Sequence, residues 1–195
     1  MRYDSEHKQK TRAKVLKAAA KAIRAEGPHQ IGVADVMAQV GLPHGGFYAH
    51  FASKDDLVAA AIGQMFEEAR ERFLHETHDC APADALRAYI DFYLSPGHRD
   101  ARRSGCPVAA LASDLPRLSK PALNQFAEGS RRMRESIASQ LEQLGRAGAG
   151  PEASSVQAEL VGALSLARVE PDVKRSDAIL ADSRRAIKQR LKLED

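Results

Sequence analysis

Apolar residues recur at helical spacing along most of the chain, and polar residues fill the positions between them. The first such segment covers about residues 6–26, and a long one runs from about residue 53 to about residue 75. Further segments follow at about residues 82–94, 107–115, 119–144, 152–168 and 176–191. We find no strand, so the pattern predicts an all-α protein with about nine helices.

A helix-turn-helix is indicated between residues 33 and 51. The first of its helices has an apolar face formed by Val33, Val36, Met37 and Val40. Gly41 follows, where a helix end favours a residue that tolerates positive φ, and Pro43 suits the start of the next helix. Phe47 and Phe51 lie four residues apart and can anchor the second helix to the first.

Two adjacent glycines stand in this second helix, although each costs on the order of 1 kcal/mol relative to alanine in a helix. Close approach explains them, because a glycine face allows backbone to lie against a DNA groove or a phosphate. The neighbouring donors to phosphates and base edges are His44, Tyr48, His50 and Lys54, beside Gly45 and Gly46. The alternative is a tight helical hairpin in an ordinary core, with the histidines simply solvated.

Charge and composition fit a DNA-binding end joined to a neutral body. Residues 1–54 hold nine Lys or Arg against four Asp or Glu, which gives +5; the other residues hold twenty against twenty-two, which gives −2. The chain has two cysteines, too few for a disulfide framework. Its opening residues have no apolar signal segment, and no apolar run is long enough to span a membrane. We therefore expect a soluble cytoplasmic protein.

The run from Gly41 to Phe51, followed by Ala-Ser-Lys-Asp-Asp-Leu, resembles the signature of the TetR/AcrR family of transcriptional regulators. The close resemblance covers residues 11–62, and the segment GCPVAALASDL is similar to one branch of the family. Pro43 and His44 depart from the usual Ser or Thr followed by Lys, and Gly32 replaces the usual Ser or Thr cap. The operator sequence therefore cannot be carried over.

The resemblance implies an N-terminal three-helix helix-turn-helix domain, residues 1–52, and a helical effector-binding and dimerisation domain, residues 53–195. It implies a homodimeric regulator, most simply a repressor, that binds a palindromic operator and is released by a small-molecule inducer. We expect no cofactor and no membrane partner. By match to the family, contacts to the sugar-phosphate backbone are expected from Lys10, Thr11 and Arg12. The helix from Ser53 would transmit the inducer's effect to the DNA-binding domain.

The last two helices carry more apolar surface than one subunit can use, and in the family these helices form a four-helix bundle with a second copy. The interface candidates are Val156, Leu160, Val161, Gly162, Leu164, Ile179, Ala186, Ile187 and Leu191. The alternative for these residues is the core of a monomer. For the effector pocket, aromatic and sulfur-containing residues are the candidates, with plain core as the alternative: Met65, Phe66, Tyr89, Phe92, Tyr93, Cys106, Phe126 and Met133.

Cys106 also supports a second hypothesis, a thiol-based redox or electrophile sensor. It precedes a predicted helix and follows Arg99, Arg102 and Arg103, surroundings that would stabilise a thiolate. Packing as a small buried hydrophobe is the alternative.

Catalytic and metal sites find little support. The His-Gly-Gly-Phe run also looks like an esterase oxyanion loop, but no G-x-S-x-G sequence or strand accompanies it, so an enzyme is a remote alternative. His75 and His78 could share a helix face, but their spacing indicates exposed histidines near a helix end rather than a zinc site.

Overall fold

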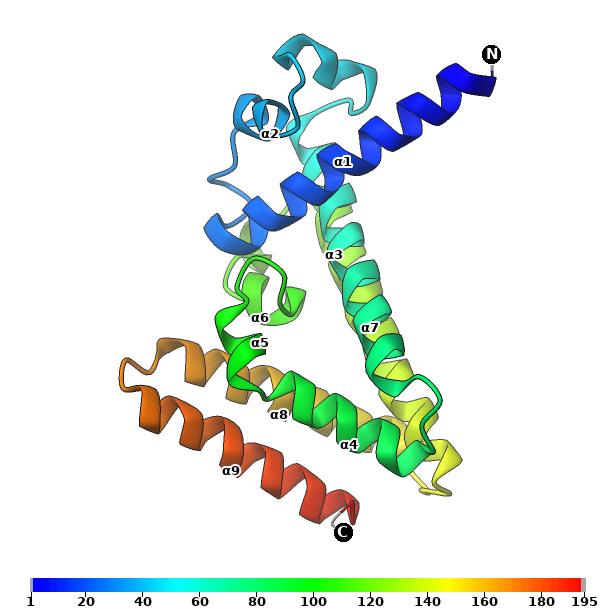
Figure 1. The fold of residues 1–195 in the computed structure, drawn as a ribbon, viewed down its shortest axis with the longest axis vertical. Helices are drawn as coiled ribbons and strands as arrows, with labels where there is room; N and C mark the ends of the chain where they lie inside the picture. The colour runs from blue at the N-terminus through cyan, green and yellow to red at the C-terminus, as the bar shows by residue number, and fades with distance from the viewer. Residues whose placement is uncertain (1, 194–195) are drawn as a thin grey trace.

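The structure is a computed structural model that describes residues 2–193, with side chains from residue 6 onward. Within these residues every regular element is helical, as the sequence pattern predicted. Figure 1 shows helix α1 crossing the top of a long helix pair, α3 and α7, and a lower group formed by α4, α8 and α9. The short helices α5 and α6 lie between the upper and lower parts. None of the described helices is both long and apolar enough to cross a membrane.

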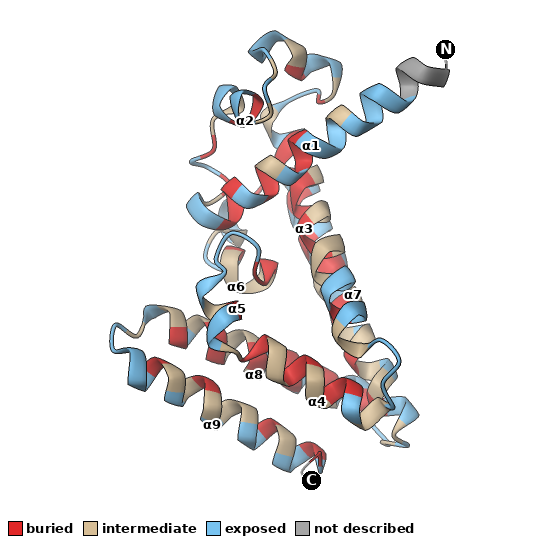
Figure 2. Ribbon diagram, viewed as in Figure 1, coloured by how far each residue is buried: buried red, intermediate tan, exposed pale blue. Residues whose placement is uncertain are grey.

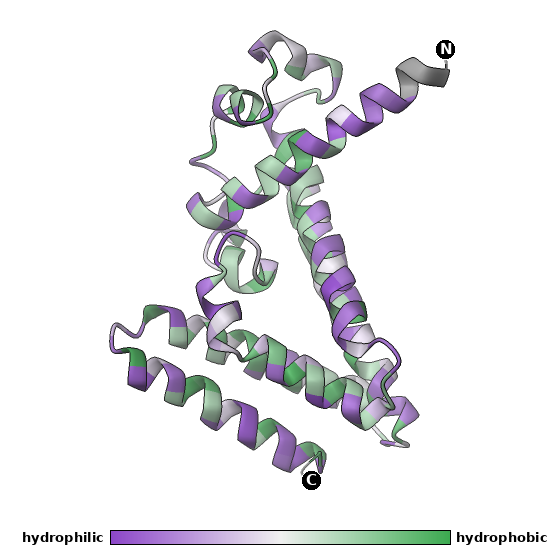
Figure 3. Cartoon of the chain, in the orientation of Figure 1, coloured by the Kyte–Doolittle hydropathy of each residue, from purple (hydrophilic) through white to green (hydrophobic). Residues whose placement is uncertain are grey.

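The N-terminal unit consists of α1 (Arg2–Glu26), α2 (Val33–Gln39) and the short 3-10 helix η1 (His44–Ala49). Its apolar faces meet as the spacing predicted, with Ile23, Met37 and Phe47 almost fully buried. Residues 6–14 of α1 are largely exposed and hydrophilic, and they extend away from the rest of the chain (Figure 3). The buried half of α1 thus anchors the unit, while the exposed half is left at the surface.

Helix α3 (Lys54–Thr77) connects this unit to the body of the protein. Its start has one half of the predicted capping box, because Ser53 Oγ accepts from the Asp56 N–H at 3.1 Å. In the other half, Asp56 Oδ2 accepts at 3.0 Å from the N–H of Ala52, one residue before the cap, instead of from Ser53. Helix α7 (Lys120–Gln143) packs along α3. The two backbones come close at Gly129, where an added Cβ would lie 2.7 Å from the Cβ of Phe66.

Between α3 and α7 the chain forms α4 (Pro82–Tyr93), α5 (Pro96–Asp100), α6 (Pro107–Leu111) and η2 (Leu115–Arg117). The apolar pattern predicts a loop, with no helix, over residues 95–105, and α5 corrects that expectation. The helix forms because Ser95 Oγ caps the N–H of His98 at 3.1 Å and a proline occupies the first turn. With five residues and mostly polar side chains, α5 has no apolar periodicity by which the sequence could reveal it.

The chain ends with α8 (Ala149–Val169) and α9 (Val173–Leu191), which pack on each other. Figure 2 shows many buried positions where α4 and α8 overlap, and mostly exposed or half-buried positions on α9. Every helix except α5 contributes apolar residues to one hydrophobic core, which continues from the N-terminal unit into the body. A displacement in the body can therefore reach the N-terminal unit through packed side chains.

Candidate DNA-binding surface and effector cavity

The turn and the η1 helix lie at the surface of the N-terminal unit. Gly41 has φ +74°, and the N–H of Leu42 bonds to the carbonyl of Met37 at 3.0 Å, so α2 closes as the sequence predicted. Phe47 is buried and stacks on Phe51 with 5.6 Å between ring centroids. The second helix is a tight 3-10 helix, and these two phenylalanines hold it against the unit.

Gly45 is not required by the protein's own packing. A Cβ built on it would meet no atom within 4 Å, and a Cβ on Gly46 would meet only the end of Met37 at 3.7 Å. Neither glycine has a positive φ. Tyr48 beside them is 69% exposed. A residue type that costs helix stability, is not needed for packing and lies at the surface indicates that something outside the subunit approaches it.

The other residues predicted to contact DNA lie around this surface and differ in exposure and in their local contacts. Lys10 and His44 are exposed, and Thr11 is partly buried. The Arg12 guanidinium lies over the Phe51 ring, 4.9 Å from its centroid, which fixes the cation at the edge of the unit. Lys54 Nζ donates to the carbonyl of His29 at 2.9 Å, so this lysine also ties α3 to the loop before α2.

Lys8 joins this cluster, although the sequence did not single it out. Burial lowers the pKa of His50, and the positive charges of Lys8 and Arg12 lower it further. His50 Nδ1 is buried and has no hydrogen-bond partner among the described residues. The effect on the pKa of His50 indicates that the charge of Lys8 lies near this histidine. The distance between the two residues depends on the angle between α1 and η1, which the sequence does not reveal.

A second site is a cavity of about 930 Å³ in the body of the protein. Helices α1, α3 and α4, the segment of residues 95–106 and one residue of α7 line it. Five of the predicted pocket residues are on its wall: Tyr89, Phe92, Tyr93, Cys106 and Met133. Phe66 instead lines a small neighbouring cavity, and Met65 and Phe126 line neither, because both are buried in the core, where Phe126 packs edge-to-face on Phe66. Burial raises the pKa of Tyr89 and Tyr93 well above the usual value, so both hydroxyls stay protonated.

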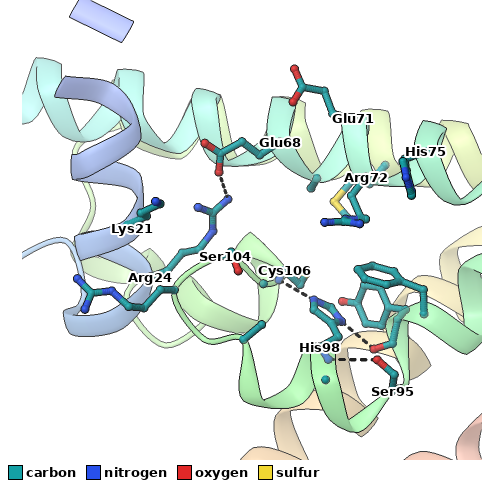
Figure 4. A pocket seen from close by; sticks show the side chains of 18 of the residues that line it. Lys21, Arg24, Glu68, Glu71, Arg72, His75, Ser95, His98, Ser104 and Cys106 are labelled. Carbon is teal, nitrogen blue, oxygen red and sulfur yellow. Dashed lines mark hydrogen bonds and ion pairs between the residues drawn. The ribbon is translucent and has the colours of Figure 1, made fainter. Parts of the chain in front are cut away.

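His98 organises one wall of this cavity and was not predicted. Its Nδ1 donates to the carbonyl of Tyr93 at 2.8 Å, and its Nε2 accepts from the N–H of Cys106 at 3.1 Å (Figure 4). The ring stacks on Phe92 with 5.0 Å between centroids. Burial lowers the pKa of His98; the bond to Tyr93 partly opposes this, and the charges of Arg168 and Arg72 add to the lowering. The neutral ring thus connects the end of α4 to the start of α6.

The lowered pKa of His98 makes the stability of the folded protein depend on pH. The unfolded chain takes up a proton on His98 near its ordinary pKa of about 6.5, whereas the folded chain resists uptake until lower pH, so stability is lost as pH falls below about 6.5. Protonated Nε2 cannot accept the N–H of Cys106, so protonation costs the parent this hydrogen bond. His98→Gln should be less stable than the parent at pH 7.5, but its stability should fall less between pH 7.5 and pH 5. Thermal denaturation at both pH values measures this, with the exposed His75→Gln as control. If His98→Gln lost as much stability as the parent between pH 7.5 and pH 5, the pH effect would not come from His98.

Cys106 lies only partly in the surroundings that the thiol-sensor hypothesis assumed, because Arg103 lines the same cavity whereas Arg99 and Arg102 have other partners. Its side chain is buried, and α6, which it caps, has five residues. The Arg99 guanidinium binds Asp100 and Asp177, and Arg102 donates to the carbonyl of Arg168 at 2.9 Å. These two arginines were expected to act on the thiolate and instead hold the polar segment onto α8 and α9.

The interface candidates on α8 and α9 need correction. Five of them belong to the subunit's own core: Val156, Leu160, Leu164, Ile187 and Leu191. Val161, Gly162 and Ile179 are partly buried and Ala186 is exposed, so these four remain accessible. Large exposed apolar side chains gather instead where α8 ends and α9 begins, namely Leu166, Val169 and Val173, which are 59%, 76% and 65% exposed. Helical spacing alone could not separate the inner face of such helices from the outer one.

The predicted histidine pair at the end of α3 makes local contacts. His75 Nδ1 lies 3.3 Å from Glu76, and His78 Nδ1 lies 2.8 Å from Asp79. Among the described residues there is no cluster of three His, Cys, Asp or Glu side chains arranged to hold a metal ion.

Comparison with known proteins gives the family. Residues 15–61 match the model described as bacterial regulatory proteins, tetR family, and residues 82–187 match a tetracyclin repressor-like C-terminal domain. The regulator LmrA of Bacillus subtilis is 26% identical over 113 residues, which cover 57% of this chain and 60% of LmrA. The regulator TtgR of Pseudomonas putida is 34% identical over 79 residues, which cover 40% of this chain and 33% of TtgR. The matches therefore span less than two thirds of these relatives, 60% of LmrA and 33% of TtgR.

Solved structures agree over nearly the whole chain. A TetR-family regulator from Agrobacterium tumefaciens has a TM-score of 0.78 at 26% identity, covering 94% of this chain and 98% of that one. The reduced form of NemR from Escherichia coli has a TM-score of 0.79 at 20% identity, covering 92% and 96%, and shows the fold alone. The helix-turn-helix, the helical body and these matches together place the chain in the tetR family of bacterial DNA-binding transcriptional regulators.

Proposed function

We propose that the protein is a homodimeric repressor that binds a near-palindromic operator through residues 1–52 and is released by a small molecule bound in its body, residues 53–195. The observation that carries the DNA-binding part is the bare surface at Gly45, which the fold leaves open and does not use. A two-fold dimer presents this surface twice, so the operator half-sites lie on one face of the duplex, about one helical turn or more apart.

The contacts at the DNA surface have two roles: some residues bind phosphates and position the protein, and others contact bases and read the sequence. Tyr48 and the exposed cations of α1, namely Lys8, Lys10 and Arg12, bind phosphates and set the register. His44 and the backbone at Gly45 and Gly46 face the bases. His50 and Lys54 are partly buried and serve mainly to shape the unit.

Two substitutions separate these roles. Tyr48→Ala should weaken binding to operator and to random duplex by similar factors, because a phosphate contact carries no sequence information. His44→Ala should lower operator affinity by on the order of tenfold and leave random duplex nearly unchanged, since one base contact contributes about 1–3 kcal/mol of discrimination. Fluorescence anisotropy at one fixed salt concentration measures both. Equal losses on the two duplexes for His44→Ala would remove His44 from base reading.

The dimer forms through the outer faces of α8 and α9. The exposed residues Leu166, Val169 and Val173 form its apolar centre, and accessible Gly162 lets the second copy come close because a Cβ there would meet nothing within the subunit. The buried residues of the same helices support this surface from behind.

Leu166→Arg should convert the dimer to a monomer at micromolar concentration, because a charge at the centre of an apolar interface is left without a partner. Sedimentation velocity measures the change, and operator affinity should fall with it because one half-site contact is lost. Leu74→Arg is the matched control, since Leu74 is 49% exposed on α3 and lies outside the proposed interface. A Leu166→Arg protein that stays dimeric would refute this surface.

The effector occupies the 930 Å³ cavity, a volume that suits a drug-sized molecule. Helices α1 and α3 both line it, so a ligand there contacts the DNA-binding unit and the long helix at once. Thermodynamic linkage then requires effector and operator to weaken each other's binding by the same factor. The thiol-sensor alternative receives less support, because Cys106 is buried and acts as part of this cavity wall. The esterase alternative receives none, because the glycine pair lies on an exposed helical turn of the DNA-binding unit.

A further inference from the structure

Arg24 is a buried charge that spans two parts of the molecule. It lies in the last turn of α1, and its side chain is 1% exposed. Its Nη2 donates to the carbonyl of Met65 at 3.2 Å and pairs with Glu68 at 2.8 Å, both on α3 (Figure 4). A single guanidinium thus joins the DNA-binding unit to the long helix.

The pairing leaves part of this guanidinium unused. Arg24 Nε and Nη1 are buried and have no hydrogen-bond partner among the described residues. An unsatisfied buried donor is costly, and a charged one more so, so native proteins provide an acceptor for it. Arg24 lines the 930 Å³ cavity, and it also lines a second, open cavity of about 440 Å³ beside α6 and η2.

The charges around the large cavity favour an anion. Among the described lining residues, five carry a positive charge, namely Lys17, Lys21, Arg24, Arg72 and Arg103, and two carry a negative charge, namely Glu68 and Glu71. Deeper in the cavity the wall is aromatic and apolar, formed by Tyr89, Phe92, Tyr93 and Met133. The cavity therefore has a cationic side formed by Lys17, Lys21 and Arg24 of α1. Its aromatic side is formed by α4, where the Arg72 guanidinium lies over the Phe92 ring, 5.2 Å from its centroid.

We propose that this cavity binds an organic oxyanion with an aromatic body, whose acid group accepts hydrogen bonds from Arg24 while the body packs on the α4 aromatics. The inference rests on the proposed function, since it names the chemical class of the effector. An acid group at Arg24 competes with Glu68 and with the Met65 carbonyl for the guanidinium. Occupancy thereby loosens the tie between α1 and α3, and the DNA-binding units lose the spacing that the operator requires.

A pair of fluorescent probes tests the class. The probe 1-anilinonaphthalene-8-sulfonate carries an anionic group, and N-phenyl-1-naphthylamine has the same aromatic body without it. We expect one site per subunit for the sulfonate and at least tenfold weaker binding of the neutral probe, because a charged hydrogen bond is lost. Arg24→Gln should reduce sulfonate affinity by about tenfold or more and leave the neutral probe unchanged. Lys14→Gln, which removes the same charge from an exposed position of α1 outside both cavities, should change neither.

Removing Arg24 leaves Glu68 without its partner and can destabilise the chain. The double variant Arg24→Gln, Glu68→Gln removes both charges, and it should show the same loss of preference for the sulfonate. Displacement of the probe by 2-naphthoate or by 2-naphthyl phosphate then distinguishes a carboxylate effector from a phosphate one. Equal binding of the two probes, or an anion preference that survives in both Arg24 variants, would overturn the proposal.

The failure of this inference is separable from failure of the proposed function. Probe binding is measured without DNA, and operator binding is measured on the unliganded protein. If probe binding does not depend on Arg24 but the protein still binds its operator, only the proposal of an anionic effector is refuted. A protein that binds the sulfonate through Arg24 but recognises no operator refutes the proposed function and leaves the anion site in place.

Discussion

Gly45→Leu should abolish specific operator binding while leaving the fold intact. A Cβ at this position meets no atom within 4 Å, so a larger side chain extends outward without disturbing the subunit. On DNA the same side chain would hold the η1 helix away from the groove. We expect operator affinity to fall about 1,000-fold or more, toward the level of random duplex, since that is the usual gap between specific and non-specific binding.

Two measurements accompany this variant. The thermal denaturation midpoint should equal that of the parent, and the salt dependence of residual binding should persist because no charge is lost. Ala127→Leu, an added leucine at an exposed position of α7, should retain full operator affinity. A Gly45→Leu protein that binds its operator as the parent does would show that this surface does not approach DNA.

Gly129→Val should be the most destabilising single substitution in the body. An added Cβ would lie 2.7 Å from the Cβ of Phe66, a contact that side-chain rotation cannot relieve, so α3 and α7 must move apart. We expect the free energy of unfolding to fall by about 3 kcal/mol or more, the upper range for overpacking a core. Urea denaturation at matched protein concentration measures the loss.

Ala127→Val is the control for this change, because it introduces the same β-branched side chain on the same helix at an exposed position. It should cost less than about 1 kcal/mol, the range of helix propensity. A loss in Gly129→Val no larger than that of the control would mean that α3 and α7 are not closely packed at this point.

The elements with local physical causes were the ones that could be predicted from sequence. The start of α3 depends on Ser53 and Asp56 alone, and the end of α2 depends on the freedom of Gly41 to adopt positive φ. The anchoring of η1 by Phe47 and Phe51 depends on their spacing. Each of these features involves residues within a few positions of one another, so pattern and chemistry together specify it.

Features that depend on distant parts of the chain could not be predicted in the same way. His98 is polar and lies in a glycine- and arginine-rich stretch, and its role follows only when folding brings Tyr93 and Cys106 to it. Leu160 and Leu166 are both apolar residues of α8, yet the first is buried and the second is exposed because the other helices cover one side of α8. The unpartnered donors of Arg24 likewise exist only once α1 has crossed α3.

A crystal structure of the protein with its operator tests most directly whether the backbone at Gly45 and Gly46 lies against DNA. The measured quantity is the shortest distance from these two residues to a base-edge atom in the major groove. We predict contact within about 4.5 Å in both half-sites of one dimer. A complex in which this turn faces solvent, or in which a single subunit binds the duplex, would contradict the account.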